Sequence, residues 1–237
     1  MTSLPFRTIA FDLDGTLADT APDIAAALNR VLATLRRPTL AEHAVRTLIG
    51  GGARSLVQRG LQAGGPAPEA LVDEGLALYL DFYAADLCNG TRPYPGAEQA
   101  MDQLAAAGVA LALCTNKVER LTHALVAALG WQGRFAAIVG GDTLPTRKPD
   151  PAMLHAAIAR AGGGPAAFVG DSITDADTAR AAGVPFVAVS FGFSDRPVEA
   201  LGADAVIDAY AELPDALADL ASRKALTRPE RLRASPT

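Results

Sequence analysis

The stretch RTIAFDLDGT at Arg7–Thr16 is a short, mostly apolar run followed at once by two acidic residues. Residues 7–11 predict a buried β-strand, and Asp12 and Asp14 follow it with a glycine that lets the chain turn and Thr16 beside them. Two neighbouring carboxylates repel each other by about 4 kcal/mol at about 4 Å for an effective dielectric constant of about 20. A cation or a shared proton has to relieve this repulsion, so the stretch predicts a chemical site at the end of a strand.

Four later segments have the same aliphatic character and alternate with helical patterns. Such alternation is typical of a parallel sheet whose strands are connected by helices. The predicted strands are VALALC at Val109–Cys114, AAIVG at Ala136–Gly140, AAFVG at Ala166–Gly170 and PFVAVS at Pro185–Ser190.

The first strand is separated from the next by residues 12–108, far more than the roughly 2 to 6 residues of an ordinary strand-to-helix connection. Gly and Pro clusters divide this interval into helical patterns at 22–36, 41–48, 53–62 and 68–85. We therefore predict a doubly wound, Rossmann-like α/β core with an inserted helical cap domain. The chain crosses between them near Ala18–Thr20 and Asn89–Pro95. The core is assigned to 1–18 and 91–221, the cap to 19–90, and 222–237 to a basic tail without ordered structure.

Composition restricts the classes of function. The net charge is -5, and the last sixteen residues carry five Lys/Arg against one Glu, so the body of the chain is more acidic than the total. An acidic body argues against a nucleic-acid-binding surface. No stretch of about 20 apolar residues predicts a membrane span, and no signal peptide is recognisable, so we expect a cytoplasmic protein without nucleic-acid or membrane partners. Cys88 and Cys114 lack the spacing of a zinc site, and the oligomeric state stays open.

Polar residues follow the other predicted strands too, and ligands bind at the carboxyl ends of strands in open parallel sheets. Thr115 and Asn116 offer a hydroxyl and a backbone N–H to a phosphate oxygen. Lys148 follows the third strand in TRKPDP, and Asp171 and Asp175 follow the fourth in GDSITD. Carboxylates with a lysine are the groups expected around Mg²⁺ and a phosphoryl group, because Mg²⁺ favours carboxylate, water and phosphate oxygens.

The segments DLDGT, CTNK, KPDP and GDSITD, in this order, resemble the four motifs of the haloacid dehalogenase superfamily of phosphotransferases. The resemblance extends over essentially the whole chain, and the helical insert is similar to that superfamily's small cap. DTAPDI at 19–24 and VSFGF at 189–193 look more narrowly like bacterial phosphoglycolate phosphatases. The resemblance implies a Mg²⁺-dependent phosphatase that acts through an aspartyl-phosphate on a small phosphorylated metabolite, with 2-phosphoglycolate the preferred substrate.

The same resemblance implies a role for each motif residue. Asp12 attacks phosphorus, and Asp14 protonates the leaving oxygen and then activates water. Thr115 and Lys148 hold the phosphoryl group. Mg²⁺ is bound by Asp12, Asp171 and the backbone carbonyl of Asp14.

Four further residues complete the predicted site. Thr16 is counted with the catalytic residues and Asn116 with the phosphate-binding ones. Asp175 is expected to orient Lys148 or a metal-bound water. Arg54, which follows three glycines at the start of a cap helix, is the candidate for reading the substrate's carboxylate.

Two alternatives remain at the level of the sequence. A sugar-phosphate phosphatase or a β-phosphoglucomutase-like mutase would share the four motifs and differ mainly in the cap. A non-catalytic binding module could keep the fold, although the presence of Asp12, Asp14, Lys148 and Asp171 favours an enzyme.

Overall fold

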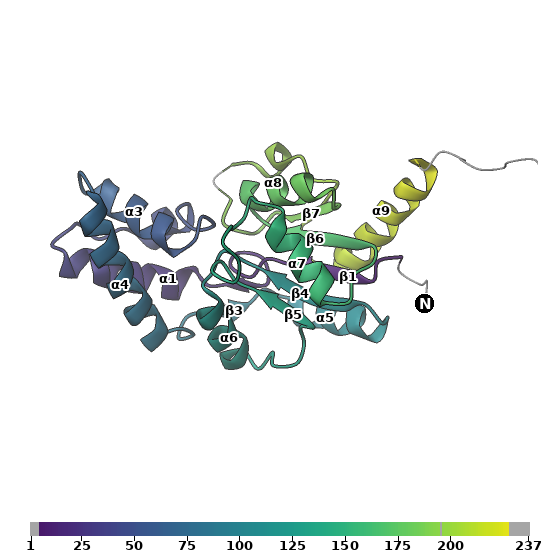
Figure 1. Ribbon diagram of the computed structural model, residues 1–237, viewed down its shortest axis with the longest axis horizontal. Helices are drawn as coiled ribbons and strands as arrows, with labels where there is room; N and C mark the ends of the chain where they lie inside the picture. The colour runs from purple at the N-terminus through teal and green to yellow at the C-terminus, as the bar shows by residue number, and fades with distance from the viewer. Residues whose placement is uncertain (1–4, 195, 228–237) are drawn as a thin grey trace, which may run out of the picture.

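The computed structural model describes residues 5–194 and 196–227, and a six-stranded parallel sheet is its centre (Figure 1). The strand order is β5-β4-β1-β6-β7-β8, so the chain moves outward from β1 on one side and then on the other. Such a reversal places a ligand site at the carboxyl ends of the central strands. The strands are β1 (Thr8–Phe11), β4 (Ala110–Cys114), β5 (Ala137–Val139), β6 (Ala166–Gly170), β7 (Phe186–Val189) and β8 (Ala205–Ile207).

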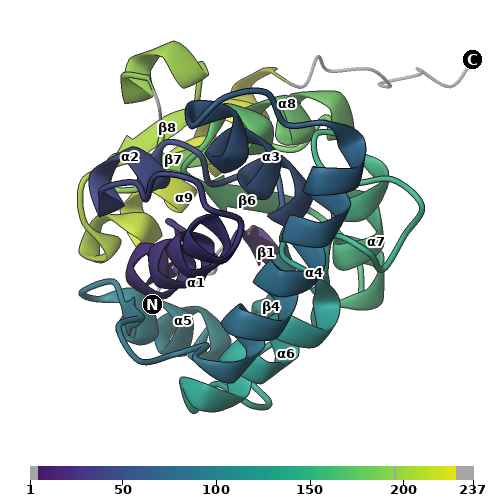
Figure 2. The same ribbon diagram turned by 90° about the vertical axis from the view of Figure 1, so that its left-hand side faces the viewer.

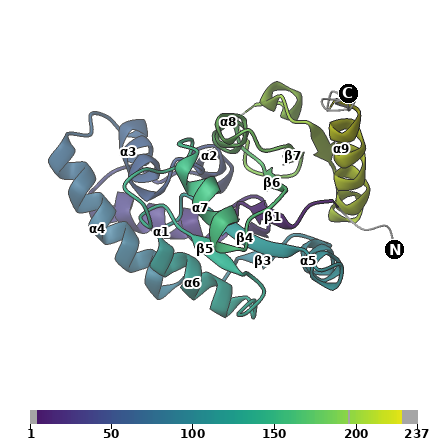
Figure 3. The same ribbon diagram turned by 45° about the vertical axis from the view of Figure 1, so that its right-hand side comes forward.

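The central strands are buried on both faces, because successive side chains point to opposite sides of the sheet and helices cover each side. Ile9 and Phe11 pack with the helices α5 (Ala97–Ala106), α6 (Glu119–Ala128) and α9 (Leu213–Thr227). Ala10 packs on the other face, with α7 (Ala152–Arg160) and α8 (Ile173–Ala182). In Figure 3, α5 and α9 lie at the end of the molecule opposite the helical insert.

The insert begins and ends at a two-stranded antiparallel pair, β2 (Ala18–Asp19) with β3 (Arg92–Pro93). The two crossings between core and insert therefore lie side by side. Between them four helices form a body of their own, on the left in Figure 1. They are α1 (Ala21–Thr34), α2 (Glu42–Arg46), α3 (Ala53–Ala63) and α4 (Glu69–Ala85).

The insert has its own apolar core, to which α1, α3 and α4 each contribute one face. Glycines permit this close packing: a Cβ on Gly60 would lie 3.0 Å from Leu28, and one on Gly75 would lie 2.8 Å from Val57. Leu121 of α6 belongs to the same cluster, so the insert also packs against the core beside the strand ends.

The structure departs from the predicted elements mainly in its C-terminal part. The sequence analysis names no strand at β8, which has only three residues at the edge of the sheet. It also begins the tail at residue 222, whereas α9 continues to Thr227 because Leu213, Leu217 and Leu220 anchor a helix on the sheet. Residues 228–237 of the assigned tail lie outside the described residues. Two short 3-10 helices, η1 (Val198–Leu201) and η2 (Tyr210–Glu212), flank β8.

Within the described part of the chain, none of the helices combines the length and apolarity required for a membrane span.

The start of α1 is tied to the second crossing by Asp23, which is buried. Its carboxylate accepts hydrogen bonds from the backbone N–H of Gly90 at 2.8 Å and from the N–H and hydroxyl of Thr91 at 2.7 and 2.6 Å. Hydrogen bonds to a buried charge are among the stronger ones, and the donors would be left unpaired without it.

We predict that Asp23→Ala lowers the free energy of unfolding by about 3 kcal/mol, measured by urea denaturation. Asp81→Ala is the matched control, because Asp81 is exposed on α4 and has no hydrogen bond or ion pair to a described residue. The control should change stability by no more than about 0.5 kcal/mol. Equal effects of the two substitutions would show that Asp23 does not fasten the crossing.

Candidate active site

The ends of β1, β4 and β6 bring three predicted residues to one edge of the sheet. Hydrogen bonding between strands continues one residue beyond two of the strands: the Asp12 N–H bonds the Val169 carbonyl at 2.9 Å, and the Thr115 N–H bonds Val139 at 3.0 Å. Asp171 directly follows β6, the parallel neighbour of β1. All three side chains start from rigid backbone, which is what a reacting constellation requires.

The turn after Asp12 depends on Gly15. This residue has φ +82°, a left-handed conformation that residues with a side chain rarely adopt. A Cβ on Gly15 would lie 2.4 Å from Asp171 Oδ2 and 2.8 Å from the Phe193 ring. The glycine therefore allows both the reversal of the chain and the close approach of Asp171.

Asp171 is held by one donor on each oxygen. The Thr16 hydroxyl donates to Oδ1 at 2.8 Å, and the Phe193 backbone N–H donates to Oδ2 at 2.7 Å. Thr16 is itself fastened, because its carbonyl accepts a hydrogen bond from the Tyr210 hydroxyl at 2.8 Å. Thr16, grouped with the catalytic residues in the sequence analysis, therefore positions Asp171.

Lys148 lies between two carboxylates. Its Nζ is 2.7 Å from Asp175 Oδ1 and 3.0 Å from Asp12 Oδ1, and all three side chains are buried. The other oxygen of Asp175 accepts hydrogen bonds from the Ser172 hydroxyl at 2.5 Å and the Ser172 N–H at 3.1 Å, as part of a capping box at the start of α8. Asp175 thus orients Lys148, one of the two tasks that the sequence analysis considers for it.

Burial dominates the electrostatics of this cluster. It raises the pKa of Asp12 to about 6, with the charges of Asp175 and Asp14 acting in the same direction and that of Lys148 opposing them. Burial, Asp175 and Asp12 also raise the pKa of Asp171 well above its usual range. For Lys148, burial would lower the pKa, but Asp12 and Asp175 outweigh it and the pKa is raised. Negative charge therefore exceeds positive charge among these buried groups.

A divalent cation fits this charge distribution. Within the described residues, Asp12, Asp171 and Asp175 form a group whose carboxylate oxygens lie within 4.8 Å of one another. Asp175 is ion-paired with Lys148 through one oxygen and accepts two hydrogen bonds from Ser172 on the other. Asp171 accepts only one hydrogen bond on each oxygen, so Asp12 and Asp171 are the better candidates for metal ligands. Asp12 Oδ1 is buried and accepts no hydrogen bond from a described residue, its contact with Lys148 being an ion pair only. Oxygen ligands of this kind suit a hard cation.

Asp14 belongs to a second group of residues. Its carboxylate pairs with Lys117 Nζ at 2.8 and 3.0 Å and accepts a hydrogen bond from the Thr20 hydroxyl at 2.7 Å. The Asp14 side chain is therefore not part of the group formed by Asp12, Asp171 and Asp175. The sequence analysis assigns no role to Lys117, although the residue stands in the CTNK segment directly after β4.

A pocket lies between these strand ends and the insert. Figure 2, seen from the side of the insert, shows its helices in front of the sheet. The polar wall consists of Asp12, Asp14, Thr115, Asn116 and Lys117. The remaining wall is mostly apolar and comes largely from the insert: Ile24, Ile49, Gly50, Gly52, Ala53, Leu56, Tyr79, Tyr83, Val118 and Leu121.

The sequence and the fold both match known proteins. The haloacid dehalogenase-like hydrolase family model matches residues 6–183. The chain belongs to the haloacid dehalogenase-like hydrolases. It is 44% identical over 212 residues to the phosphoglycolate phosphatase of Caulobacter vibrioides, covering 88% of this chain and 90% of that one.

Solved structures agree with this membership. A predicted phosphoglycolate phosphatase from Haemophilus somnus 129PT superposes with a TM-score of 0.83 at 32% identity, over 89% of this chain and 97% of the other. CbbY from Rhodobacter sphaeroides, solved in complex with phosphate, superposes with a TM-score of 0.75 at 27% identity, over 88% and 96% of the two chains.

The side chains of two predicted site residues of this hydrolase, Asn116 and Arg54, are bonded to other parts of the chain. The side chain of Asn116 joins the core to the insert: its amide group donates to the Gly50 carbonyl at 3.0 Å and the Lys148 carbonyl at 3.1 Å, and its oxygen accepts from the Lys148 N–H at 3.0 Å. Only the backbone N–H of Asn116 is left for the phosphate-binding role, which is the group that the sequence analysis names.

Arg54 lies apart from the other predicted residues. Its guanidinium forms ion pairs with Asp73, at 2.6 Å, and with Glu69. Both carboxylates belong to the N-terminal part of α4, which packs beside α3, and Arg54 is not among the residues that line the pocket. This arrangement does not favour the prediction that Arg54 reads the substrate's carboxylate, because acidic neighbours within the insert bind its guanidinium.

We predict that Gly15→Ala reduces phosphatase activity by at least about 100-fold, since the added methyl would displace Asp171. Gly108→Ala is a matched control: Gly108 has φ +77°, and no atom lies within 4 Å of its Cβ position. The control retains the backbone strain, about 1 to 2 kcal/mol, without the collision. It should lose stability in urea but keep its activity. Similar activity losses in both variants would mean that glycine is required at position 15 because of backbone strain and not because of the close approach of Asp171.

Proposed function

We propose that this hydrolase is a metal-dependent phosphatase acting on 2-phosphoglycolate through a covalent aspartyl-phosphate on Asp12. The observation that carries the proposal is the position of Asp12, buried beside Lys148 and Asp171 while lining the same pocket as Asp14. The substrate is suggested by relatives of 41 to 44% identity that bear the name phosphoglycolate phosphatase.

In this proposal Asp12 is the nucleophile. One carboxylate oxygen attacks phosphorus, the bond to the ester oxygen breaks, and the resulting acyl-phosphate is later hydrolysed by water. Lys148 offsets the charge of Asp12 and of the phosphoryl oxygens, and Asp175 keeps the ammonium in place. The Thr115 hydroxyl and the Asn116 backbone N–H bind phosphoryl oxygens.

Asp14 is proposed as the general acid and base. It lines the pocket two residues beyond Asp12, so its carboxyl group can give a proton to the leaving ester oxygen and later take one from the attacking water. Lys117 and Thr20 restrict the carboxylate to one position and thereby define where the leaving oxygen lies.

Mg²⁺ is the proposed metal, held by Asp12, Asp171 and the Asp14 backbone carbonyl. When bound, it supplies positive charge that neutralises the phosphoryl oxygens and the buried carboxylates. The hydrogen bonds to Asp171 from Thr16 and Phe193 orient this carboxylate toward the site.

We further propose that the insert, residues 19–90, acts as a cap on the core formed by residues 1–18 and 91–221. Asn116 bonds the insert at Gly50, and the Arg46 guanidinium lies 5.2 Å from the centre of the Phe193 ring. Both contacts join the insert to the strand-end loops and would break if it moved away on β2 and β3. A closed cap excludes water while the phosphoryl group is transferred, and an open one admits it.

The lining of the pocket favours a small acid over a sugar as the leaving group. Sugars need several hydrogen-bonding partners, whereas the insert contributes mainly aliphatic and aromatic side chains. The sugar-phosphate phosphatase and the mutase considered from the sequence are therefore less well supported than the phosphoglycolate phosphatase.

The test of the proposed function is phosphate release from a panel of small phosphate esters, with Mg²⁺ and with excess chelator. We predict the highest kcat/KM for 2-phosphoglycolate, ahead of glucose phosphates and p-nitrophenyl phosphate. Chelation should abolish turnover, Mg²⁺ should restore it, and Ca²⁺ should inhibit, because its looser coordination spoils the in-line geometry. Full activity in the chelator would refute the metal, and faster hydrolysis of glucose phosphates would refute the substrate.

Asp12→Asn should reduce phosphate release by about 100-fold or more, since an amide cannot form the acyl-phosphate. The near-isosteric change should leave the fold intact, as judged by thermal unfolding. Asp177→Asn is the control, because Asp177 lies on the exposed face of α8 and pairs only with Arg180. Turnover by the Asp12 variant above about one per cent of the wild-type rate would eliminate the nucleophile assignment.

A further inference from the structure

Lys117 provides the only cationic side chain of the pocket lining among the described residues. Its Nζ pairs with both oxygens of Asp14 and lies 4.6 Å from the centre of the Tyr83 ring. The side chain is only 5% exposed. A buried ammonium therefore stands where the polar strand ends meet the apolar wall of the insert.

Tyr83 contributes a second polar group to the same pocket, and this group has no assigned role in the proposed mechanism. Its hydroxyl is buried and has no hydrogen-bond partner among the described residues. The ring is held in place by stacking on Tyr79, with centroids 5.6 Å apart and planes within 6°. Burial, with the nearby charge of Asp14, raises the pKa of Tyr83 well above its usual value, so the group stays an O–H donor. A buried donor without a partner is unfavourable, which points to a ligand acceptor.

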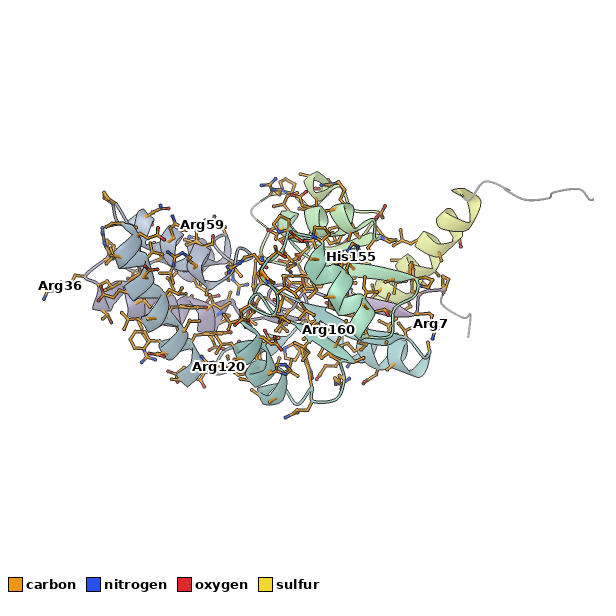
Figure 4. The ribbon with its side chains drawn as sticks, in the orientation of Figure 1. Arg7, Arg36, Arg59, Arg120, His155 and Arg160 are labelled. Carbon is orange, nitrogen blue, oxygen red and sulfur yellow. The ribbon has the colours of Figure 1, made fainter. Side chains whose placement is uncertain are left out.

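The arginines of the insert do not line the pocket, and other groups of the chain account for the contacts of most of them. Arg30, Arg46 and Arg54 are paired with carboxylates, and Arg37 and Arg59 donate to backbone carbonyls. Figure 4 shows Arg36 and Arg59 on the outside of the insert.

Two further cations of the core, Lys148 and Arg147, lie close to residues of the pocket lining. Lys148 is occupied by Asp12 and Asp175 on the phosphoryl side. Arg147 reaches the region, with Nη1 3.4 Å from the Cβ position of Gly52, but it is exposed and does not line the pocket.

We propose that Lys117 and the Tyr83 hydroxyl bind the carboxylate of the leaving group and so determine which phosphate esters are hydrolysed. This inference rests on the proposed function and deepens it. In phosphoglycolate the carboxyl carbon is two bonds from the ester oxygen that Asp14 protonates. Because Lys117 contacts Asp14 directly, an acid of this length brings its carboxylate to the ammonium. An ester with the same carbon skeleton but no charge leaves Lys117 and Tyr83 without that partner.

The subsite formed by Lys117 and the Tyr83 hydroxyl suits a singly charged carboxylate better than a second, doubly charged phosphate group. Lys117 already shares its charge with Asp14, and the neighbouring wall, formed by Ile24, Leu56 and Leu121, offers no further cation. A doubly charged group placed there would be poorly neutralised.

The experiment compares kcat/KM for 2-phosphoglycolate with that for ethyl phosphate, in which a methyl group replaces the carboxylate. Lys117→Met preserves the packing of the side chain and removes its charge. The preference for phosphoglycolate should fall about tenfold or more, mainly through KM. Tyr83→Phe should lower it by a smaller factor, and Lys117→Arg should restore part of it. Inhibition by glycolate should weaken in parallel.

The ratio of kcat/KM for 2-phosphoglycolate to that for ethyl phosphate distinguishes two roles of Lys117, which are binding the substrate's carboxylate and positioning Asp14. Equal losses on both esters, with unchanged glycolate inhibition, would mean that Lys117 acts only through Asp14 and would overturn the proposal. Arg147→Gln is the control cation and should leave the ratio unchanged. A fall in the ratio with Arg147→Gln but not with Lys117→Met would assign the carboxylate to Arg147 instead. If Lys117→Met fails to fold, Lys117→Arg and Tyr83→Phe decide the matter by the same ratio.

The wild-type enzyme tests the underlying function independently of the variants. Absence of any preference for phosphoglycolate over ethyl phosphate would refute the proposed substrate, and the subsite with it. A clear wild-type preference that survives in Lys117→Met and Tyr83→Phe would refute the subsite alone.

Discussion

The buried carboxylates of Asp12 and Asp171 lie at the ends of adjacent strands, and their mutual repulsion constrains everything around them. Lys148 offsets part of this negative charge. Asp175 holds the Lys148 ammonium in place and also caps the start of α8. Hydrogen bonds donated by the Thr16 hydroxyl and the Phe193 N–H fix the orientation of the Asp171 carboxylate. Gly15 and Gly192 have no side chain at the points where Asp171 approaches most closely, since a Cβ there would lie 2.4 and 2.2 Å from its atoms.

The division between core and insert separates chemistry from recognition. Groups that can react with a phosphoryl group all stand at strand ends of the sheet, where backbone hydrogen bonds hold them rigidly. The insert supplies apolar walls of the pocket and two stacked tyrosines, Tyr79 and Tyr83, which we propose to contact the leaving group. Lys117 connects the two parts, since it follows β4 in the core but reaches Tyr83 of the insert.

This division explains how one family can contain enzymes with different substrates. The chain shares its fold with CbbY, solved with phosphate, and with predicted phosphoglycolate phosphatases. In the proposed mechanism the Asp, Thr and Lys residues at the strand ends act on the phosphoryl group alone, so selectivity among esters has to come from residues beyond them. The proposed pairing of Lys117 with Tyr83 locates that selectivity at the junction of core and insert, and a replaced insert residue could alter it without disturbing Asp12.

The sequence by itself determined five of the six strands of the sheet, the interruption after the first strand, and the choice of Asp12, Asp14, Lys148 and Asp171 as candidate site residues. It could do so because strand periodicity and the polar residue after each strand are local features, and parallel topology gathers strand ends at one edge. Only the tertiary structure decided the partners of side chains. Arg54 binds carboxylates of α4, Asn116 joins the insert to the core, and Lys117 meets Tyr83, which is 34 positions away. Such contacts depend on how the insert packs against the core and not on spacing along the chain, so a local sequence pattern cannot predict them.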